Sequence, residues 1–248
     1  MTDEPTALSA VDGRHQLHIE KRLAHPVQRV WSAITEPAQL SRWFPAQVEL
    51  ELRPGAPVRY SMDPHLPDQD GTVLEVDPPR LLVITWDDNV LRMELEPDGD
   101  GCRLLFTQIF DDLAGAASFA SGWDACLGYL EAQLAGAEPP PPGPMDAAHE
   151  QQVSSLGLRV GTIEQTPSGW RVRVERQLVR PAEVVRPLLP VDDAGHWELG
   201  EGTGHGARLV LTHDRLPDEA QARRVLDESH ERVETFALGL LEQPHPTR

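Results

Sequence analysis

The sequence predicts an α+β fold in which a curved antiparallel sheet packs on one long C-terminal helix, followed by a smaller, truncated repeat of the same fold. Three observations predict it. Apolar residues alternate with period two in short runs across the first half of the chain, and a long amphipathic helix closes that half. The same pattern returns after a proline-rich linker. The 248 residues are enough for one large domain or two small ones.

The first elements are a strand and two short helices. Residues 1–14 are expected to form a flexible N-terminus, as chain ends often do. Residues 15–23 alternate between apolar and polar side chains, which predicts a strand. Pro26 opens a short helix, because proline suits the first helical turn. Pro37 opens another, which is expected to run to Phe44.

Six further strands and a helix complete the first half. Turn residues separate the strands by short connections, which favours an antiparallel meander. The predicted strands are Gln47–Leu52, Val58–Met62, Thr72–Val76, Leu81–Trp86, Val90–Leu95 and Arg103–Phe110. A helix is predicted over 117–135, because its apolar residues form one stripe at helical spacing.

A linker divides the chain. Four consecutive prolines at 139–142 cannot continue a helix or pair in a central strand, so 138–152 is predicted to be an extended linker. We therefore expect a first domain over 15–137 and a reduced second domain over 153–243. Residues 244–248 are expected to be a tail.

The second domain repeats the first in three ordered blocks. Residues 15–34 match 170–189 at an offset of 155, and 101–107 match 206–212 at an offset of 105. The last helix matches at an offset of 107, which aligns Trp123 with His230. The drop in offset indicates that the second domain lacks about 50 residues. These correspond to the second short helix and most of the middle strands. We predict about four strands, the first of them within 156–165, and a C-terminal helix; without the middle strands this domain is not expected to enclose a cavity alone.

The first half resembles the activator-of-heat-shock-ATPase-homologue group of the START-like, helix-grip (SRPBCC) superfamily. The resemblance covers about residues 15–137 and depends on short motifs in family order. They include Val30-Trp31, Thr35-Glu36-Pro37, Trp43-Phe44-Pro45, Pro54-Gly55, Gly71-Thr72-Val73-Leu74-Glu75, Pro78-Pro79-Arg80-Leu81, Thr85-Trp86 and Gly122-Trp123. It implies a helix-grip fold with a cavity between sheet and helix, which in this superfamily commonly binds apolar or amphipathic small molecules.

The cavity candidates are large apolar side chains with a few polar groups, which suit the binding of such a molecule. They are Trp43, Tyr60, Met62, Trp86, Met93, Phe106, Gln108, Phe119, Trp123 and Leu127. The same side chains could simply fill a core. Two other function classes stay open: a protein-interaction module related to chaperone activators, and a small-molecule enzyme of cyclase or hydrolase type.

For the enzyme hypothesis the sequence offers acid–base candidates and no nucleophile motif, so no catalytic residue is assigned. The candidates are Gln108, Asp111, Asp112, Tyr60 and His65. Histidines 196, 205 and 213 lack the short spacings of a zinc site, so no metal or cofactor is predicted. The glycine-rich 200–206 is followed by a strand, which favours a hairpin turn over a phosphate loop. His230 lies on the apolar stripe of the last helix and is interpreted as a core histidine.

Composition excludes several partners. The 40 acidic and 22 basic side chains give a net charge of −18, which disfavours binding to nucleic acid or to anionic membranes. No apolar run approaches the length of a membrane span. Two cysteines, at 102 and 126, indicate a reducing, cytoplasmic setting and buried free thiols. The expected partners are a small apolar or amphipathic molecule and, through the second domain, a protein or another copy of the chain.

Overall fold

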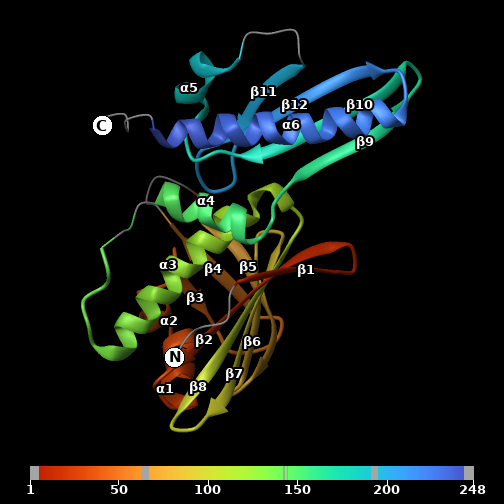
Figure 1. Cartoon of the computed structure of the whole chain (residues 1–248). Helices are drawn as coiled ribbons and strands as arrows, with labels where there is room; N and C mark the ends of the chain where they lie inside the picture. Colours follow the sequence, from red (N-terminus) through yellow and green to blue (C-terminus); the bar gives the residue numbers. More distant parts are fainter. Residues whose placement is uncertain (1–5, 63–66, 142, 144, 191–194, 243–248) are drawn as a thin grey trace. The chain divides into compact units, whose positions relative to one another are not determined.

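The computed structural model describes residues 6–62, 67–141, 143, 145–190 and 195–242, and the chain divides into two compact units (Figure 1). The first unit comprises residues 1–112 and 122–142, and the second comprises 113–121 and 143–248. Helix α3 therefore contributes residues to both units. Each unit has one antiparallel sheet and one long helix, which confirms the predicted α+β class.

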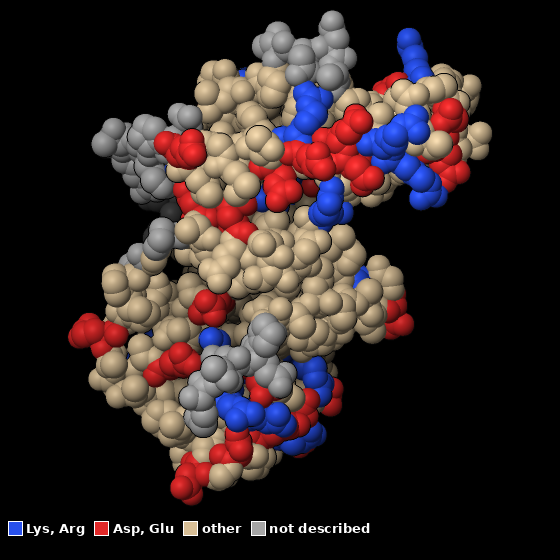
Figure 2. All heavy atoms as spheres, viewed as in Figure 1, with Lys and Arg blue, Asp and Glu red and all other residues tan. Residues whose placement is uncertain are grey.

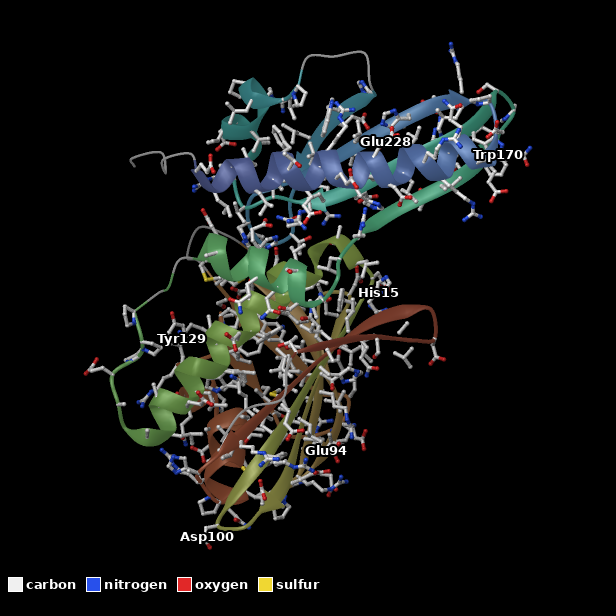
Figure 3. All side chains as sticks on the ribbon, in the orientation of Figure 1. His15, Glu94, Asp100, Tyr129, Trp170 and Glu228 are labelled. Atoms are coloured by element: carbon white, nitrogen blue, oxygen red, sulfur yellow. The ribbon has the colours of Figure 1, made fainter. Side chains whose placement is uncertain are left out.

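The first unit contains an eight-stranded sheet in the order β1-β2-β8-β7-β6-β5-β4-β3. The strands are β1 (Ala7–Val11), β2 (Arg14–Leu23), β3 (Gln47–Leu50), β4 (Pro57–Ser61), β5 (Gln69–Asp77), β6 (Leu81–Trp86), β7 (Asn89–Asp98) and β8 (Gly101–Phe110). From β3 to β8 each strand pairs with the next one along the chain, as expected for a meander. Figure 3 shows Asp100 at the tip of the β7–β8 hairpin.

Two short helices form one strand connection of this unit, and a long helix follows its last strand. Helices α1 (Val27–Thr35) and α2 (Pro37–Leu40) connect β2 to β3, and each begins beside a proline as predicted. Helix α2 ends at Leu40 rather than Phe44, and turn residues carry the chain to β3. The 3₁₀ helix η1 (Leu113–Gly115) leads into α3 (Ala116–Ala135), close to the predicted bounds of the long helix.

A strand lies where a flexible N-terminus was expected. Strand β1 pairs with β2 through the turn at Asp12 and Gly13, both of which have positive φ angles of 49° and 82°. An Asp-Gly pair favours such a two-residue hairpin, because glycine and aspartate tolerate these angles. The prediction for 1–14 is therefore wrong over Ala7–Val11, and the turn signal was in the sequence.

The second unit contains a four-stranded sheet in the order β11-β12-β10-β9. Its elements are α4 (Met145–Ser155), β9 (Val160–Thr166), β10 (Gly169–Gln177), α5 (Ala182–Val185), η2 (Arg186–Leu188), β11 (His196–Glu201), β12 (Ala207–Leu216), α6 (Glu219–Gly239) and η3 (Leu240–Glu242). The glycine-rich segment connects β11 to β12 as the predicted hairpin. Figure 3 places Trp170 at the β9–β10 end of this sheet.

Helix α4 lies within the segment that was predicted to be a linker. Two of its carboxylates, one turn apart, each pair with an arginine: Asp146 Oδ2 lies 3.0 Å from Arg180 Nη1, and Glu150 pairs with Arg176. Both arginines are buried, at 3% and 8% exposure. Because buried charges require partners, these pairs hold α4 on the second unit. The linker prediction is thus wrong from Met145 onward.

The two sheets share an order that suggests a partial repeat. Strands β1-β2-β8-β7 of the first sheet correspond to β9-β10-β12-β11 of the second. The pairing register agrees with the sequence offsets: Leu17 pairs with Gln108 in the first sheet, and Val172 pairs with His213 in the second. The elements without a counterpart are α2 and β3–β6, which are the segments that the offsets predicted to be missing.

Charges are mixed on the surface. On the face shown in Figure 2, acidic and basic side chains lie beside one another rather than in separate patches. Among the described helices, none is long and apolar enough to cross a membrane.

Candidate functional site

The predicted cavity residues of the first unit are packed together in its core. Seven of the ten are buried, with exposures between 0% and 4%: Trp43, Tyr60, Met93, Phe106, Gln108, Trp123 and Leu127. Trp86 and Phe119 are half-buried, and Phe119 is counted with the second unit. Met62 follows the end of β4 and is 47% exposed, so the expectation that it faces inward is wrong.

Aromatic rings occupy the space between this sheet and α3. The Phe106 and Trp123 rings have centroids 4.5 Å apart, and Phe44 lies 5.4 Å from Trp123. The Tyr60 ring stacks on Trp86 at 5.4 Å. These separations are those of directly packed aromatic pairs. The rings thus pack directly against one another in the region in which the ligand was expected.

The polar groups among these side chains bind one another. Trp123 Nε1 donates to Gln108 Oε1 at 2.6 Å, and Gln108 Nε2 donates to Asn89 Oδ1 at 3.2 Å. The other bonds run from Trp43 Nε1 to the Ala33 carbonyl, from the Tyr60 hydroxyl to the Thr85 carbonyl and from Trp86 Nε1 to Gln69 Oε1. A ligand would have to break these bonds to be held by the same groups.

The acid–base and metal candidates do not form a site. Asp111 is exposed and accepts from Arg14 at 2.7 and 3.0 Å, while His65 lies outside the described residues. His196 is exposed, and His213 Nε2 lies 3.0 Å from the hydroxyl of Ser229. Within the part of the chain that the structure describes, no group of three metal-binding side chains is placed to hold an ion.

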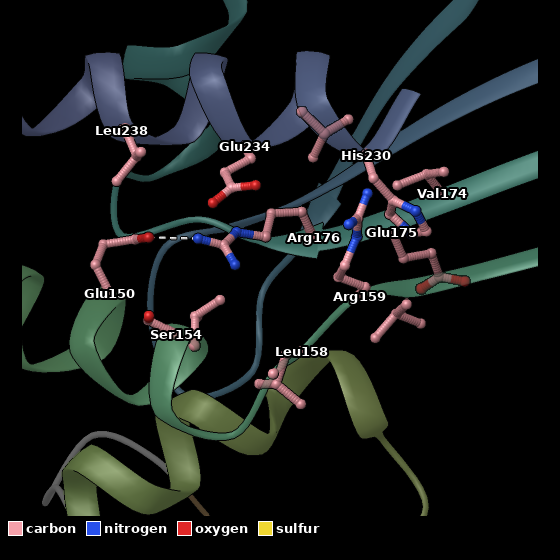
Figure 4. A pocket seen from close by; sticks show the side chains of 14 residues that line it. Glu150, Ser154, Leu158, Arg159, Val174, Glu175, Arg176, His230, Glu234 and Leu238 are labelled. Atoms are coloured by element: carbon pink, nitrogen blue, oxygen red, sulfur yellow. Dashed lines mark hydrogen bonds and ion pairs between the residues drawn. The ribbon is translucent and has the colours of Figure 1, made fainter. Parts of the chain in front are cut away.

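A pocket of about 400 Å³ lies in the second unit, between the sheet and α6 (Figure 4). Helix α4 supplies one wall, β9 and β10 the floor, and α6 the opposite wall. The lining residues are Glu150, Val153, Ser154, Gly157, Leu158, Arg159, Val160, Val174, Glu175, Arg176, His230, Val233, Glu234 and Leu238. This volume falls in the range of small-molecule sites.

The pocket combines valine and leucine side chains with charged groups. Arg176 rises from the floor, and its guanidinium donates to Glu150 (Figure 4). Two buried atoms of this pair have no hydrogen-bond partner: Arg176 Nε and Glu150 Oε1. Burial raises the pKa of Glu150, Arg176 opposes this shift, and the nearby Glu234 carboxylate adds to it.

His230 contributes a neutral imidazole. Burial lowers its pKa, the Arg159 guanidinium lowers it further, and a hydrogen bond to the backbone of Val160 opposes the shift. Nε2 of His230 is buried without a hydrogen-bond partner. The interpretation of His230 as a satisfied core histidine is therefore wrong.

The aligned helix positions of the two units differ at this place. His230 aligns with Trp123, whose indole packs against Phe106 in the first unit, and Glu234 aligns with Leu127. Where α3 carries two bulky apolar side chains, α6 thus carries a smaller imidazole ring and a carboxylate. The second unit has no counterparts of β3–β6, and α4 contributes Glu150, Val153 and Ser154 to the pocket lining. Because lining residues such as Arg159 and Glu234 are exposed, the pocket is open to solvent rather than enclosed.

Sequence reasoning missed most of the pocket. Glu150 lay in the presumed linker, and Arg159 and Arg176 were assigned only to strands. The alignment of His230 with Trp123 was the one available signal, because it showed a bulky core position replaced by a polar one. The spacing of Asp146 and Glu150 could have indicated a helix face, but nothing local identified its arginine partners.

Comparison with known proteins finds one similar family and several similar solved structures. The family model described as Activator of Hsp90 ATPase homolog 1-like protein matches residues 24–135. Among solved structures, CalU16 from Micromonospora echinospora is 22% identical, with a TM-score of 0.50 over 63% of this chain and 97% of CalU16. A conserved protein of unknown function from Enterococcus faecalis, EF2215, is 18% identical, with a TM-score of 0.54 over 60% of this chain and 88% of that protein. These likenesses show the helix-grip fold. No curated protein matches the chain.

Proposed function

Starting from a first unit with the fold of the Activator of Hsp90 ATPase homolog 1-like family, we propose that the protein binds a small amphipathic molecule in the pocket of its second unit. One observation carries the proposal: the space between sheet and helix is filled by bonded aromatic side chains in the first unit and is an open pocket of about 400 Å³ in the second.

The pocket has the composition of a ligand site. Valine and leucine side chains offer apolar contact, and a few charged groups converge on the same space. Such a combination of an apolar lining with a small number of polar groups is typical of small-molecule sites. Arg176 supports it further, because it is 8% exposed and has an unpartnered Nε against the pocket. A buried donor without a partner costs free energy that a ligand acceptor would recover.

Two neighbouring serines of α4 provide a test. Both serines are exposed, but Ser154 lines the pocket and Ser155 does not. We expect Ser154→Trp to fill the pocket and Ser155→Trp to leave it open. The probe is anilinonaphthalene sulfonate, an amphipathic dye whose fluorescence rises on binding, titrated into the full chain. Wild type and Ser155→Trp should bind it alike, and Ser154→Trp should lose at least about tenfold in affinity, which corresponds to about 1.4 kcal/mol.

Native mass spectrometry complements the titration. A small molecule that co-purifies with wild type and Ser155→Trp, but not with Ser154→Trp, would support the proposal and give the ligand's mass. Equal dye binding by both tryptophan variants would overturn it. In that case the protein-interaction alternative would become the leading hypothesis.

A further inference from the structure

Charge pairing in the pocket indicates which molecule it takes. Of its five charged side chains, Arg176 pairs with Glu150, and Glu175 pairs with Arg208 at 3.3 Å outside the pocket. Arg159 and Glu234 remain, and neither has an ion-pair partner within the described chain. The pocket therefore presents one uncommitted cation and one uncommitted anion beside its valine and leucine side chains.

We infer that the pocket binds an amino-acid-like zwitterion, a molecule with one ammonium group, one carboxylate and an apolar side group. The inference rests on the proposed function of the same pocket. The carboxylate would pair with Arg159, and the ammonium with Glu234. The side group would lie on the valine and leucine side chains that line the pocket. A ligand with a single charge would leave either Arg159 or Glu234, which we call the rim groups, without a partner of opposite charge.

The buried polar atoms fit the same ligand. Glu150 Oε1 lacks a hydrogen-bond donor, and an ammonium group has three N–H donors to offer. Arg176 Nε lacks an acceptor, which a carboxylate oxygen supplies. Figure 4 shows the Arg176 guanidinium between Glu150 and the side of the pocket that carries Arg159 and His230. Acceptors and donors therefore both face the pocket, as recognition of a zwitterion requires.

Isothermal titration with four indole compounds measures the effect of each ligand charge, because the compounds share the apolar indole ring and differ in their charged groups. The set is L-tryptophan, tryptamine with the ammonium only, indole-3-propionate with the carboxylate only, and 3-methylindole with neither. We expect the full chain to bind L-tryptophan about five- to tenfold more tightly than either singly charged compound, the gain of one added charge-assisted pair. The Ser154→Trp variant should abolish binding of the whole set.

Variants at the rim identify the partner of each charge. Arg159→Gln should bring the affinity for L-tryptophan down to that for tryptamine and leave tryptamine unchanged. Glu234→Gln should bring the affinity for L-tryptophan down to the affinity for indole-3-propionate. Arg224→Gln and Glu231→Gln are the controls, because both residues are exposed on α6 and lie outside the pocket. Neither control should change the affinity for any of the compounds.

The outcomes separate the two proposals. If all four compounds bind equally and Ser154→Trp abolishes binding, the proposal that the pocket binds a small molecule is supported and the zwitterion inference is wrong. The inference also falls if the dye binds in the pocket and none of the four compounds does. If neither the dye nor any compound binds, both proposals fall.

Discussion

His149 should make the second unit lose stability in mild acid. The side chain is 0% exposed, and its Nδ1 lies 3.4 Å from the Ser118 hydroxyl. Burial above all, with the neighbouring His205 and Arg176, lowers the pKa of His149 from 6.5 to about 4. The folded chain therefore binds this proton more weakly than the unfolded chain does.

The magnitude follows from that difference. A pKa gap between 6.5 and about 4 corresponds to about 3 kcal/mol. Above pH 6.5 the imidazole is neutral in both states and adds no pH dependence. Between pH 6.5 and pH 4 the unfolded chain gains the proton first, so the free energy of unfolding falls with pH, by about 3 kcal/mol in total.

The assay compares His149→Gln with wild type in urea unfolding at pH 7.5, 6.5, 5.5 and 4.5, with hydrogen exchange of β10 peptides as the probe of the second unit. At pH 7.5 the free energy of unfolding of the variant should be lower than that of wild type. On acidification the variant should lose less of it, so that the two values converge. His196→Gln, which removes an exposed histidine, is the control and should follow wild type. Parallel pH curves for wild type and His149→Gln would refute the reasoning.

Three further changes test the packing. Gln108→Leu should destabilise the first unit by about 1–3 kcal/mol in urea unfolding, because it leaves the buried Trp123 N–H without an acceptor; an unchanged midpoint would contradict this. Leu127→Ala, at a fully buried position, should cost about 2–5 kcal/mol in the same assay, and a cost below about 1 kcal/mol would indicate that the core is not filled there. Gly206→Ala should cost more than about 2 kcal/mol, because its Cβ would lie 1.9 Å from a backbone carbonyl and its φ is 69°. Gly204→Ala shares the positive φ in open space and should cost about 1 kcal/mol; equal costs at both positions would exclude the clash.

Much of the fold could be predicted because its signals are local. Alternating residues and turn prolines located β6 to the residue, and the stripe on α3 located the long helix within one residue. The sequence offsets between the two halves agree with the observed pairing of Val172 with His213. Each of these features depends on neighbours within a few residues, or on similarity between two segments.

The pocket could not be predicted in the same way, because it depends on contacts between distant segments. Arg176 on β10 meets Glu150 on α4, 26 residues earlier, and no local pattern pairs them. Conversely, the aromatic residues of the first unit had the composition of a ligand cavity. Whether such rings fill a space or surround it is decided by how closely they pack, and composition does not specify that.

Hydrogen exchange of the full chain with and without saturating L-tryptophan tests the central claim most directly. Our account predicts that protection increases in α4, in β10 and in the part of α6 around His230 and Glu234. Exchange in β8 and in residues 122–135 of α3 should stay unchanged. Protection confined to β8 and those residues of α3, with none in α6, would place the ligand in the first unit and contradict the account.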